Sequence, residues 1–256
     1  MTLLASTPPQ VRTVSVSSKS FRLDVAIVDR GLAPSRSQAE SYIKLGHVMV
    51  DGHLAKKTNM MVQSSSKIVL ITEEHYVSRA GLKLSSVAKK FGLDFSKKMV
   101  LDVGSSTGGF TDYALQHGAT KVIAVEVGTK QLHPSLLGHP QIELHEQKDI
   151  RDFRTSQNID IVVVDVSFVS LREILPTVRH IANKNTQIVA LVKPQFEAYQ
   201  SNLKHKGVIK NEKIRREIMK NFEEWANRNF IIQNKADSMV SGEKGNIERF
   251  FLLKKL

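Results

Sequence analysis

The residues of this chain best suited to chemistry are a glycine-rich loop and several polar side chains that end apolar runs. The loop reads Asp-x-Gly-x-x-x-Gly-Gly from Asp102 to Gly109, after the apolar run Met99–Val103 and before a helical pattern over Phe110–His117. Glycine lets a backbone approach a ligand closely and adopt angles that a Cβ would forbid. A strand, a glycine loop and a helix in this order are typical of Rossmann-like sites for adenosine-containing cofactors.

The spacing of this loop is not the Gly-x-Gly-x-x-Gly of dinucleotide sites, and it favours S-adenosylmethionine over NAD. Considered alone, the loop is also compatible with an ordinary strand-to-helix turn. We expect cofactor contacts from the following loop residues: Asp102, Gly104, Ser105, Ser106, Thr107, Gly108, Gly109 and Phe110.

Polar residues that follow the next two predicted strands are further cofactor candidates, because ligands bind beyond the carboxyl ends of parallel strands. Glu126 follows the apolar run Val122–Val125 and can accept hydrogen bonds from both ribose hydroxyls of an adenosine; a solvated glutamate is the alternative. Val127 adjoins it. Asp149 and Ile150 follow a third strand, and we expect them to flank the adenine.

Asp165 and Lys193 end two further apolar runs, Ile161–Val164 and Gln187–Val192. A single lysine after a strand is usually a surface residue, but a lysine and an aspartate on adjacent strand ends can do acid–base work. Methyl transfer to a ribose hydroxyl requires a group that takes the hydroxyl proton, and a lysine amine does so when its surroundings lower its pKa. This chemistry needs no metal.

The elements that must position these residues alternate along the chain. Strands and helices alternate until the last two strands, which only a loop separates; Pro176 should kink or start the helix that contains it. The further elements are predicted over Arg79–Phe91, Ile142–Leu144, Leu171–Ala182, Asn211–Arg228, Phe230–Asn234 and Ile247–Leu253. This order predicts an α/β fold with a mainly parallel, seven-stranded sheet and an antiparallel last strand.

Composition limits the partners and the compartment. The chain of 256 residues carries a formal net charge of +12, which favours a polyanionic partner such as nucleic acid and is also compatible with an anionic membrane surface. It has 0 cysteines, which excludes disulfides, thiolate metal sites and cysteine nucleophiles and is compatible with the cytoplasm, where we expect the protein. No apolar stretch approaches the roughly 20 residues of a membrane span.

A smaller unit precedes the large one. Residues 1–20 are predicted to be a disordered tail, with an organelle transit peptide as the alternative. Residues 21–72 contain two short helices and a small sheet, in which Ser35 and Gln38 form a capping-box pair and Asp51-Gly52 marks a hairpin. Residues 73–77 are predicted to be a linker, and the large domain covers residues 78–256.

The segment Arg22–Gly52 resembles the alpha-L RNA-binding module, first named from a ribosomal protein of the small subunit. The shared pattern is R-L-D-V-x-x-V-x-R-G-L-x-x-S-R-x-x-A-x-x-x-I-x-x-G-x-V-x-V-D-G. The resemblance implies that basic side chains lie against RNA phosphates, where they attach RNA without reading its sequence. The RNA-binding candidates are Arg22, Arg36, Lys44, Lys56, Lys57 and Arg79.

The large domain resembles the TlyA (haemolysin A) branch of the FtsJ-type ribose 2′-O-methyltransferases. The shared blocks are Tyr76–Leu84, Leu101–Phe110, Asp165–Leu171, Leu191–Glu197 and Gly245–Glu248. The family's Lys-Asp-Lys-Glu tetrad then falls on Lys83, Asp165, Lys193 and Glu248. The resemblance implies S-adenosylmethionine as cofactor, a ribosomal RNA or ribosomal subunit as partner, and a cytidine as target. Lys193 is assigned to the hydroxyl proton, Asp165 to holding Lys193 and facing the methyl group, and Lys83 and Glu248 to orienting the ribose.

This chain departs from the family pattern at three places. Glu126 stands where the family commonly has Asp, the segment 128–133 lacks the usual aromatic residue, and Asp149 stands where Asn is frequent. The alternatives to an RNA methyltransferase are an idle RNA-binding or assembly factor, a membrane-active haemolysin and an NAD dehydrogenase.

Overall fold

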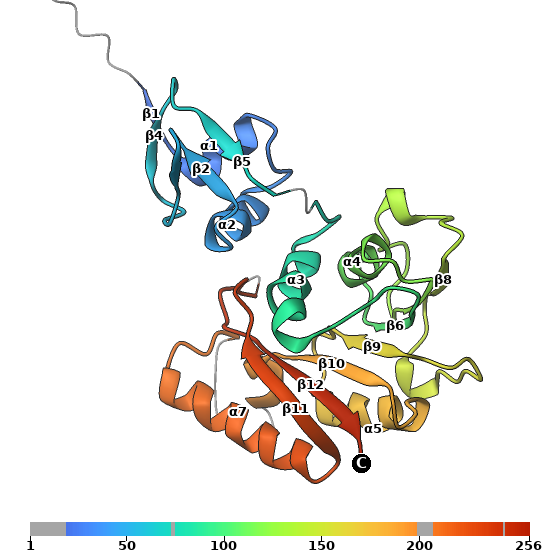
Figure 1. Cartoon of the computed structure of the whole chain (residues 1–256). Coiled ribbons are helices and arrows are strands. Elements are labelled where there is room, and N and C mark those ends of the chain that lie inside the picture. The colour runs from blue at the N-terminus through green and yellow to red at the C-terminus, as the bar shows by residue number, and fades with distance from the viewer. Residues whose placement is uncertain (1–18, 73–74, 199–206, 243) are drawn as a thin grey trace, which may run out of the picture.

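The computed structural model describes residues 19–72, 75–198, 207–242 and 244–256 (Figure 1). A small N-terminal part precedes a larger part built on a seven-stranded sheet. The predicted tail lies outside the described residues except for Lys19 and Ser20, and so do residues 73–74 of the predicted linker.

The N-terminal part contains two helices and two small sheets. Strand β2 lies between β3 and β5, and β1 pairs with β4, all antiparallel. The elements are β1 (Ser20–Arg22), α1 (Leu23–Asp29), α2 (Arg36–Lys44), β2 (Val48–Val50), β3 (His53–Leu54), β4 (Met61–Gln63) and β5 (Ile68–Leu70). The predicted hairpin is confirmed: Asp51 and Gly52 have φ values of 49° and 82°, the positive angles that a tight hairpin turn requires.

The predicted capping box of α2 is half formed. The Ser35 hydroxyl accepts a hydrogen bond from the Gln38 backbone N–H at 3.3 Å, as expected. The Gln38 side chain does not return to Ser35; its amide donates to the Tyr76 carbonyl at 3.2 Å. Gln38 therefore ties α2 to the segment that leads into the large domain.

The large sheet has the strand order β11-β12-β10-β9-β6-β7-β8. Strands β10, β9, β6, β7 and β8 are parallel to one another, and the last strand, β12, runs antiparallel between β10 and β11. The strands are β6 (Met99–Val103), β7 (Lys121–Val125), β8 (Ile142–His145), β9 (Ile161–Val164), β10 (Gln187–Val192), β11 (Phe230–Asp237) and β12 (Arg249–Lys255). The predicted fold class is confirmed.

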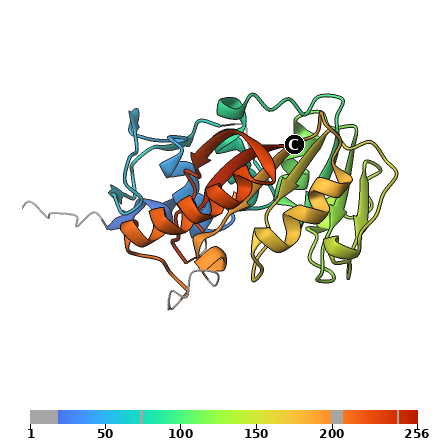
Figure 2. The same ribbon diagram turned by 90° about the horizontal axis from the view of Figure 1, so that it is seen from below.

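Helices cover both faces of this sheet (Figures 1 and 2). Neighbouring strand residues point to opposite faces, so that Val100 packs in the cluster with α3 and α4, and Leu101 in the cluster with α5 and α7. The helical elements are α3 (Arg79–Phe91), α4 (Gly109–Gln116), η1 (Pro134–Leu136), η2 (Ile150–Asp152), α5 (Leu171–Ile181), α6 (Pro194–Glu197) and α7 (Glu212–Asn227). Within the described ranges, no helix combines the length and apolar content that a bilayer crossing needs.

Pro176 does not start α5, which begins at Leu171 and continues past the proline. The proline removes the hydrogen bond that residue 176 would donate to the Arg172 carbonyl. The burial of Ile174, Leu175 and Val178 against the sheet offsets this loss.

Candidate functional site

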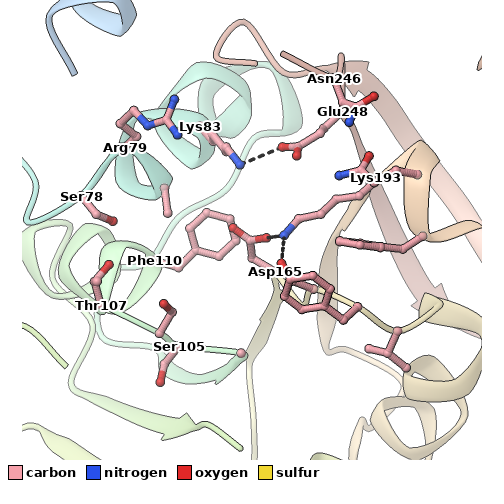
Figure 3. A pocket seen from close by; sticks show the side chains of 18 of the residues that line it. Ser78, Arg79, Lys83, Ser105, Thr107, Phe110, Asp165, Lys193, Asn246 and Glu248 are labelled. Atoms are coloured by element: carbon pink, nitrogen blue, oxygen red, sulfur yellow. Dashed lines mark hydrogen bonds and ion pairs between the residues drawn. The ribbon is translucent and has the colours of Figure 1, made fainter. Parts of the chain in front are cut away.

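Two buried ion pairs lie beyond the carboxyl ends of the parallel strands of the large sheet (Figure 3). Lys83 projects from α3, and its Nζ lies 2.7 Å from Oε2 of Glu248, the residue directly before β12. Lys193 and Asp165 follow the neighbouring parallel strands β10 and β9, and Lys193 Nζ lies 2.7 Å from Asp165 Oδ1. Lys193 Nζ also donates to the Ser167 hydroxyl at 2.8 Å. The structure thus brings together all four residues of the predicted tetrad.

The charges in this group stabilise one another. Burial by itself raises the pKa of Asp165, but the ammonium groups of Lys193 and Lys83 outweigh burial and hold that pKa below its usual value. Burial by itself lowers the pKa of Lys83, but the carboxylates of Asp165 and Glu248 outweigh it and raise that pKa above its usual value. Asp165 is therefore a carboxylate and Lys83 an ammonium ion at neutral pH.

The glycine loop lies beside this group and leads from β6 into α4. Gly104 has a φ of 80°, and a Cβ at this position would lie 2.7 Å from the Asp165 carbonyl oxygen. Only glycine therefore lets the loop pass the end of β9 this closely. Glu126, at the end of β7, accepts hydrogen bonds from the Ser106 N–H at 2.9 Å and the Gly128 N–H at 2.8 Å.

Asp102 lies beneath the loop with almost no exposure to solvent. Its Oδ2 accepts a hydrogen bond from the Thr111 hydroxyl at 2.6 Å, while its Oδ1 has no hydrogen-bond partner in the described part of the chain. Burial raises the pKa of Asp102 to about 7, with a further contribution from the charge of Asp165. An unpartnered buried oxygen beside a cavity is a ready acceptor for a ligand's N–H or O–H group.

The loop and the ion pairs line one cavity of about 1120 Å³. Typical ligand pockets measure ~300–1,000 Å³, so this space is large enough for a nucleoside cofactor together with part of a second molecule. The predicted site residues that line it are Arg79, Lys83, Asp102, Gly104, Ser105, Ser106, Thr107, Phe110, Asp165, Lys193 and Glu248.

The other predicted cofactor residues lie outside the cavity lining. Gly108 and Gly109 form the start of α4 behind the loop. The Glu126 carboxylate accepts hydrogen bonds from the backbone N–H groups of Ser106 and Gly128. The Arg151 guanidinium lies 2.7 Å from the Asp149 carboxylate, and the Arg151 backbone N–H also donates to that carboxylate. These hydrogen bonds keep the pKa of Asp149 below its usual value. Val127 is exposed, and Ile150 is buried in the apolar cluster beneath α5.

Several further side chains at the cavity were not predicted, among them Ser167, Phe168 and Phe196. Ser167 accepts the hydrogen bond from Lys193, and Phe168 is 92% exposed with its ring 5.3 Å from that of Phe196. Ser167 and Phe168 lie two and three residues after Asp165, so their place in the loop that follows this strand end was the signal available in the sequence.

The basic residues predicted to contact RNA fall into three groups. Arg22 and Arg36 both pair with the buried Asp24 at 2.9 Å, and these hydrogen bonds lower the pKa of Asp24 to about 2. Lys44 donates to the Ser241 hydroxyl at 3.1 Å, which connects the N-terminal part to the loop before β12. Lys56 and Lys57 are exposed, and Arg79 lines the cavity (Figure 3).

Comparison with known proteins finds two families. The sequence model described as FtsJ-like methyltransferase matches residues 76–255, and that described as S4 domain matches residues 21–68. The chain is 37% identical to "Hemolysin A" of Brachyspira hyodysenteriae over 89% of this chain and 97% of the relative. It is 34% identical to "16S/23S rRNA (cytidine-2'-O)-methyltransferase TlyA" of Mycobacterium tuberculosis over 93% of this chain and 91% of the relative.

A solved structure from Streptococcus thermophilus, described as a hemolysin, has the same overall architecture. It superposes with a TM-score of 0.67 at 33% identity, and the match covers 93% of this chain and 90% of the other.

Proposed function

Because the chain belongs to the FtsJ-like methyltransferases, in the branch of TlyA and haemolysin A with its N-terminal S4 domain, we propose that it methylates the 2′-hydroxyl of a ribose in ribosomal RNA. The methyl donor is S-adenosylmethionine. The target is a cytidine, the nucleotide that the name of the mycobacterial relative specifies.

The observation that carries this proposal is the convergence of Lys83–Glu248 and Lys193–Asp165 on the cavity beside the glycine loop (Figure 3). The residues fit the cofactor: the loop approaches closely at Gly104, and the free Oδ1 of Asp102 can accept a hydrogen bond from its amino group. When bound, S-adenosylmethionine supplies a methyl group made electrophilic by a positively charged sulfur.

The four tetrad residues then have separate tasks. In its neutral amine form, reached by loss of one proton to solvent, Lys193 Nζ would accept the proton of the ribose 2′-hydroxyl as that oxygen takes the methyl group. Asp165 and Ser167 hold Lys193 Nζ at the end of β10. The Lys83 ammonium, kept charged by Asp165 and Glu248, donates hydrogen bonds that orient the ribose. Holding the reactants in line supplies several kcal/mol of the acceleration.

The N-terminal part supplies RNA attachment. Arg22, Arg36, Lys44, Lys56 and Lys57 add positive charge to a small unit of the S4 type. Phosphate contacts of this kind position a partner without reading its sequence. We propose ribosomal RNA or a ribosomal subunit as the partner and the cytoplasm as the compartment, with which the absence of cysteines from the chain is compatible.

Ribose-methylation mapping tests the proposal. Ribosomal RNA from cells that lack this protein is compared with RNA from cells complemented with the wild type, with Lys193→Ala or with Lys213→Ala, an exposed lysine of α7. We expect one or a few 2′-O-methylated cytidines with the wild type and with Lys213→Ala, and none with Lys193→Ala. No difference at any position would contradict the proposed activity. Full methylation with Lys193→Ala would remove Lys193 from the mechanism.

A further inference from the structure

A second connection joins the two segments that carry Asp165 and Lys193. Glu197, at the end of α6, accepts a hydrogen bond from the Ser170 hydroxyl at 2.7 Å through Oε2 and from the Leu171 N–H at 2.7 Å through Oε1. Its side chain is buried, with 2% of its surface exposed. Glu197 therefore fastens α6, which starts directly after Lys193, to the start of α5.

The two connections enclose one turn of chain. At one side, Lys193 contacts Asp165 and Ser167; at the other, Glu197 contacts Ser170 and Leu171. The residues between them, Ser167 to Ser170, line the cavity. The position of this turn relative to Lys193 is thus fixed at both of its ends.

The enclosed turn has a backbone conformation that needs support. Phe168 has a φ of 66°, a left-handed conformation that is unfavourable for a residue with a bulky side chain. Its side chain is almost fully exposed, so core packing does not hold it there. Such conformations persist only where the surrounding structure supports them, and the contacts of Lys193 with Ser167 and of Glu197 with Ser170 and Leu171 flank Phe168 on either side.

A carboxylate is well suited to the connection that Glu197 makes to the start of α5. Leu171 is the first residue of α5, where backbone N–H groups have no intrahelical partner and a negative charge is favoured. The Arg172 Nε lies 3.5 Å from Glu197 Oε2 and adds a positive partner. Because the site is buried, removing Glu197 leaves the Leu171 N–H without a replacement acceptor.

Resting on the proposed methyl transfer, we propose that Glu197 is a positioning residue that holds the turn from Asp165 to Ser170 against Lys193. It contacts neither the cofactor nor the ribose. It keeps Ser167 within reach of Lys193 Nζ, so that the amine stays aimed at the 2′-hydroxyl.

Glu197→Ala, Glu197→Gln and Ser170→Ala test this role in the full chain with ribosomal RNA and S-adenosylmethionine. We expect Glu197→Ala to lower kcat about 10- to 100-fold with the KM for RNA changed less than about 3-fold, because small misplacements of reacting groups carry penalties of this size. We expect Glu197→Gln to restore kcat to within about 3-fold of the wild type, since an amide can accept from Leu171 and donate to Ser170. Ser170→Ala should add little to the loss in a Glu197→Ala background.

Glu143→Ala is the control for removal of a hydrogen-bonded glutamate away from the cavity; the Glu143 side chain is 33% exposed. Glu143 on β8 accepts hydrogen bonds from His145 and Gln157 and pairs with Lys121, but it lies away from the cavity lining. If Glu197→Ala lowers the melting temperature as Glu143→Ala does and leaves kcat unchanged, or if both variants lower kcat equally, the positioning role is wrong.

Amide hydrogen exchange separates this proposal from the proposed function, because it needs no RNA. We expect Glu197→Ala to accelerate exchange over residues 165–171 at least about 10-fold relative to the wild type and to Glu143→Ala. Unchanged exchange would show that Glu197 does not hold this turn in place, even if the enzyme is active. A wild type that methylates no RNA overturns the proposed function and leaves the exchange result to decide whether Glu197 holds this turn.

Discussion

Lys83 Nζ and Glu248 Oε2 lie 2.7 Å apart, although 165 positions separate the two residues in the chain. The side chains are 10% and 2% exposed, so little water competes for either charge. Removing one partner of a buried pair leaves the other charge uncompensated. This pair therefore supports both stability and, in the proposed mechanism, the orientation of the ribose.

We expect Glu248→Ala to lower the free energy of unfolding by about 3 kcal/mol, because it leaves the Lys83 ammonium buried without its nearest partner. The double variant Lys83→Met/Glu248→Leu removes both charges and should recover most of that stability while remaining inactive in methyl transfer. Urea unfolding and single-turnover methylation measure the two effects. A double variant with wild-type activity would show that the pair is only structural.

Asp102 predicts a pH dependence of stability. Its pKa is about 7 in the folded chain, above the ~3.9 of an unfolded aspartate. The folded state therefore binds the proton more tightly, and the contribution of Asp102 is fully present below about pH 4 and is lost as the pH rises toward 7. Relative to the wild type, Asp102→Asn should gain stability by a few kcal/mol over this interval and remain constant above it.

The Asp102 prediction is measured by urea unfolding of wild type and Asp102→Asn at pH values from 4.5 to 8 without cofactor. Parallel stability curves for the two proteins across this range would contradict it. The Thr111 hydroxyl can still donate to the asparagine carbonyl, so the comparison isolates the charge.

Gly104→Ala tests the approach of the loop to β9. The new Cβ would lie 2.7 Å from the Asp165 carbonyl oxygen, in addition to the strain of a φ of 80°. Gly138→Ala is the matched control, because Gly138 has a φ of 73° and nothing within 4 Å of a Cβ. We expect both variants to lose about 1 kcal/mol of stability from backbone strain.

Only Gly104→Ala is expected to weaken the binding of S-adenosylhomocysteine, by at least about 10-fold in isothermal titration calorimetry. Equal affinities for both variants and the wild type would place the cofactor elsewhere than against this loop.

The exposed lysines of the N-terminal part predict a salt-dependent contribution to RNA binding. We expect Lys56→Ala/Lys57→Ala to weaken RNA binding and to lower the slope of log affinity against log salt by about 1 to 2, with an unchanged melting temperature. Arg36→Ala should lower the melting temperature as well, because Arg36 compensates the buried Asp24. Filter binding at several salt concentrations measures the slope. An unchanged slope would remove these two lysines from the RNA interface.

The sequence predicts the large sheet well because its strands are apolar runs that end in polar residues. The strand Ile161–Val164 and the helix Arg79–Phe91 have the predicted bounds, and Asp165 and Lys193 meet because parallel strands end at a common edge. The sequence does not predict β1 and β4, because both strands are mostly exposed and neither is a continuous apolar run.

Lys83 and Glu248 could be found only through the family resemblance. Lys83 lies between the buried Leu82 and Leu84 in α3, and a lysine in a helix ordinarily reaches solvent. Its burial depends on a carboxylate delivered by the other end of the chain, which no local pattern reports. Glu197 was in a shared block without an assigned role, since its partners, Ser170 and Leu171, lie on another element.

The two parts of the chain share a continuous apolar cluster. Tyr42 and Val50 of the N-terminal part belong to the same buried cluster as Leu82 and Val87 of α3. Separate domains joined by a flexible tether melt independently, whereas a common interior couples their unfolding. The part that attaches RNA and the part that holds the tetrad should therefore melt in one calorimetric transition, so RNA bound to the first part would raise the melting temperature of the second.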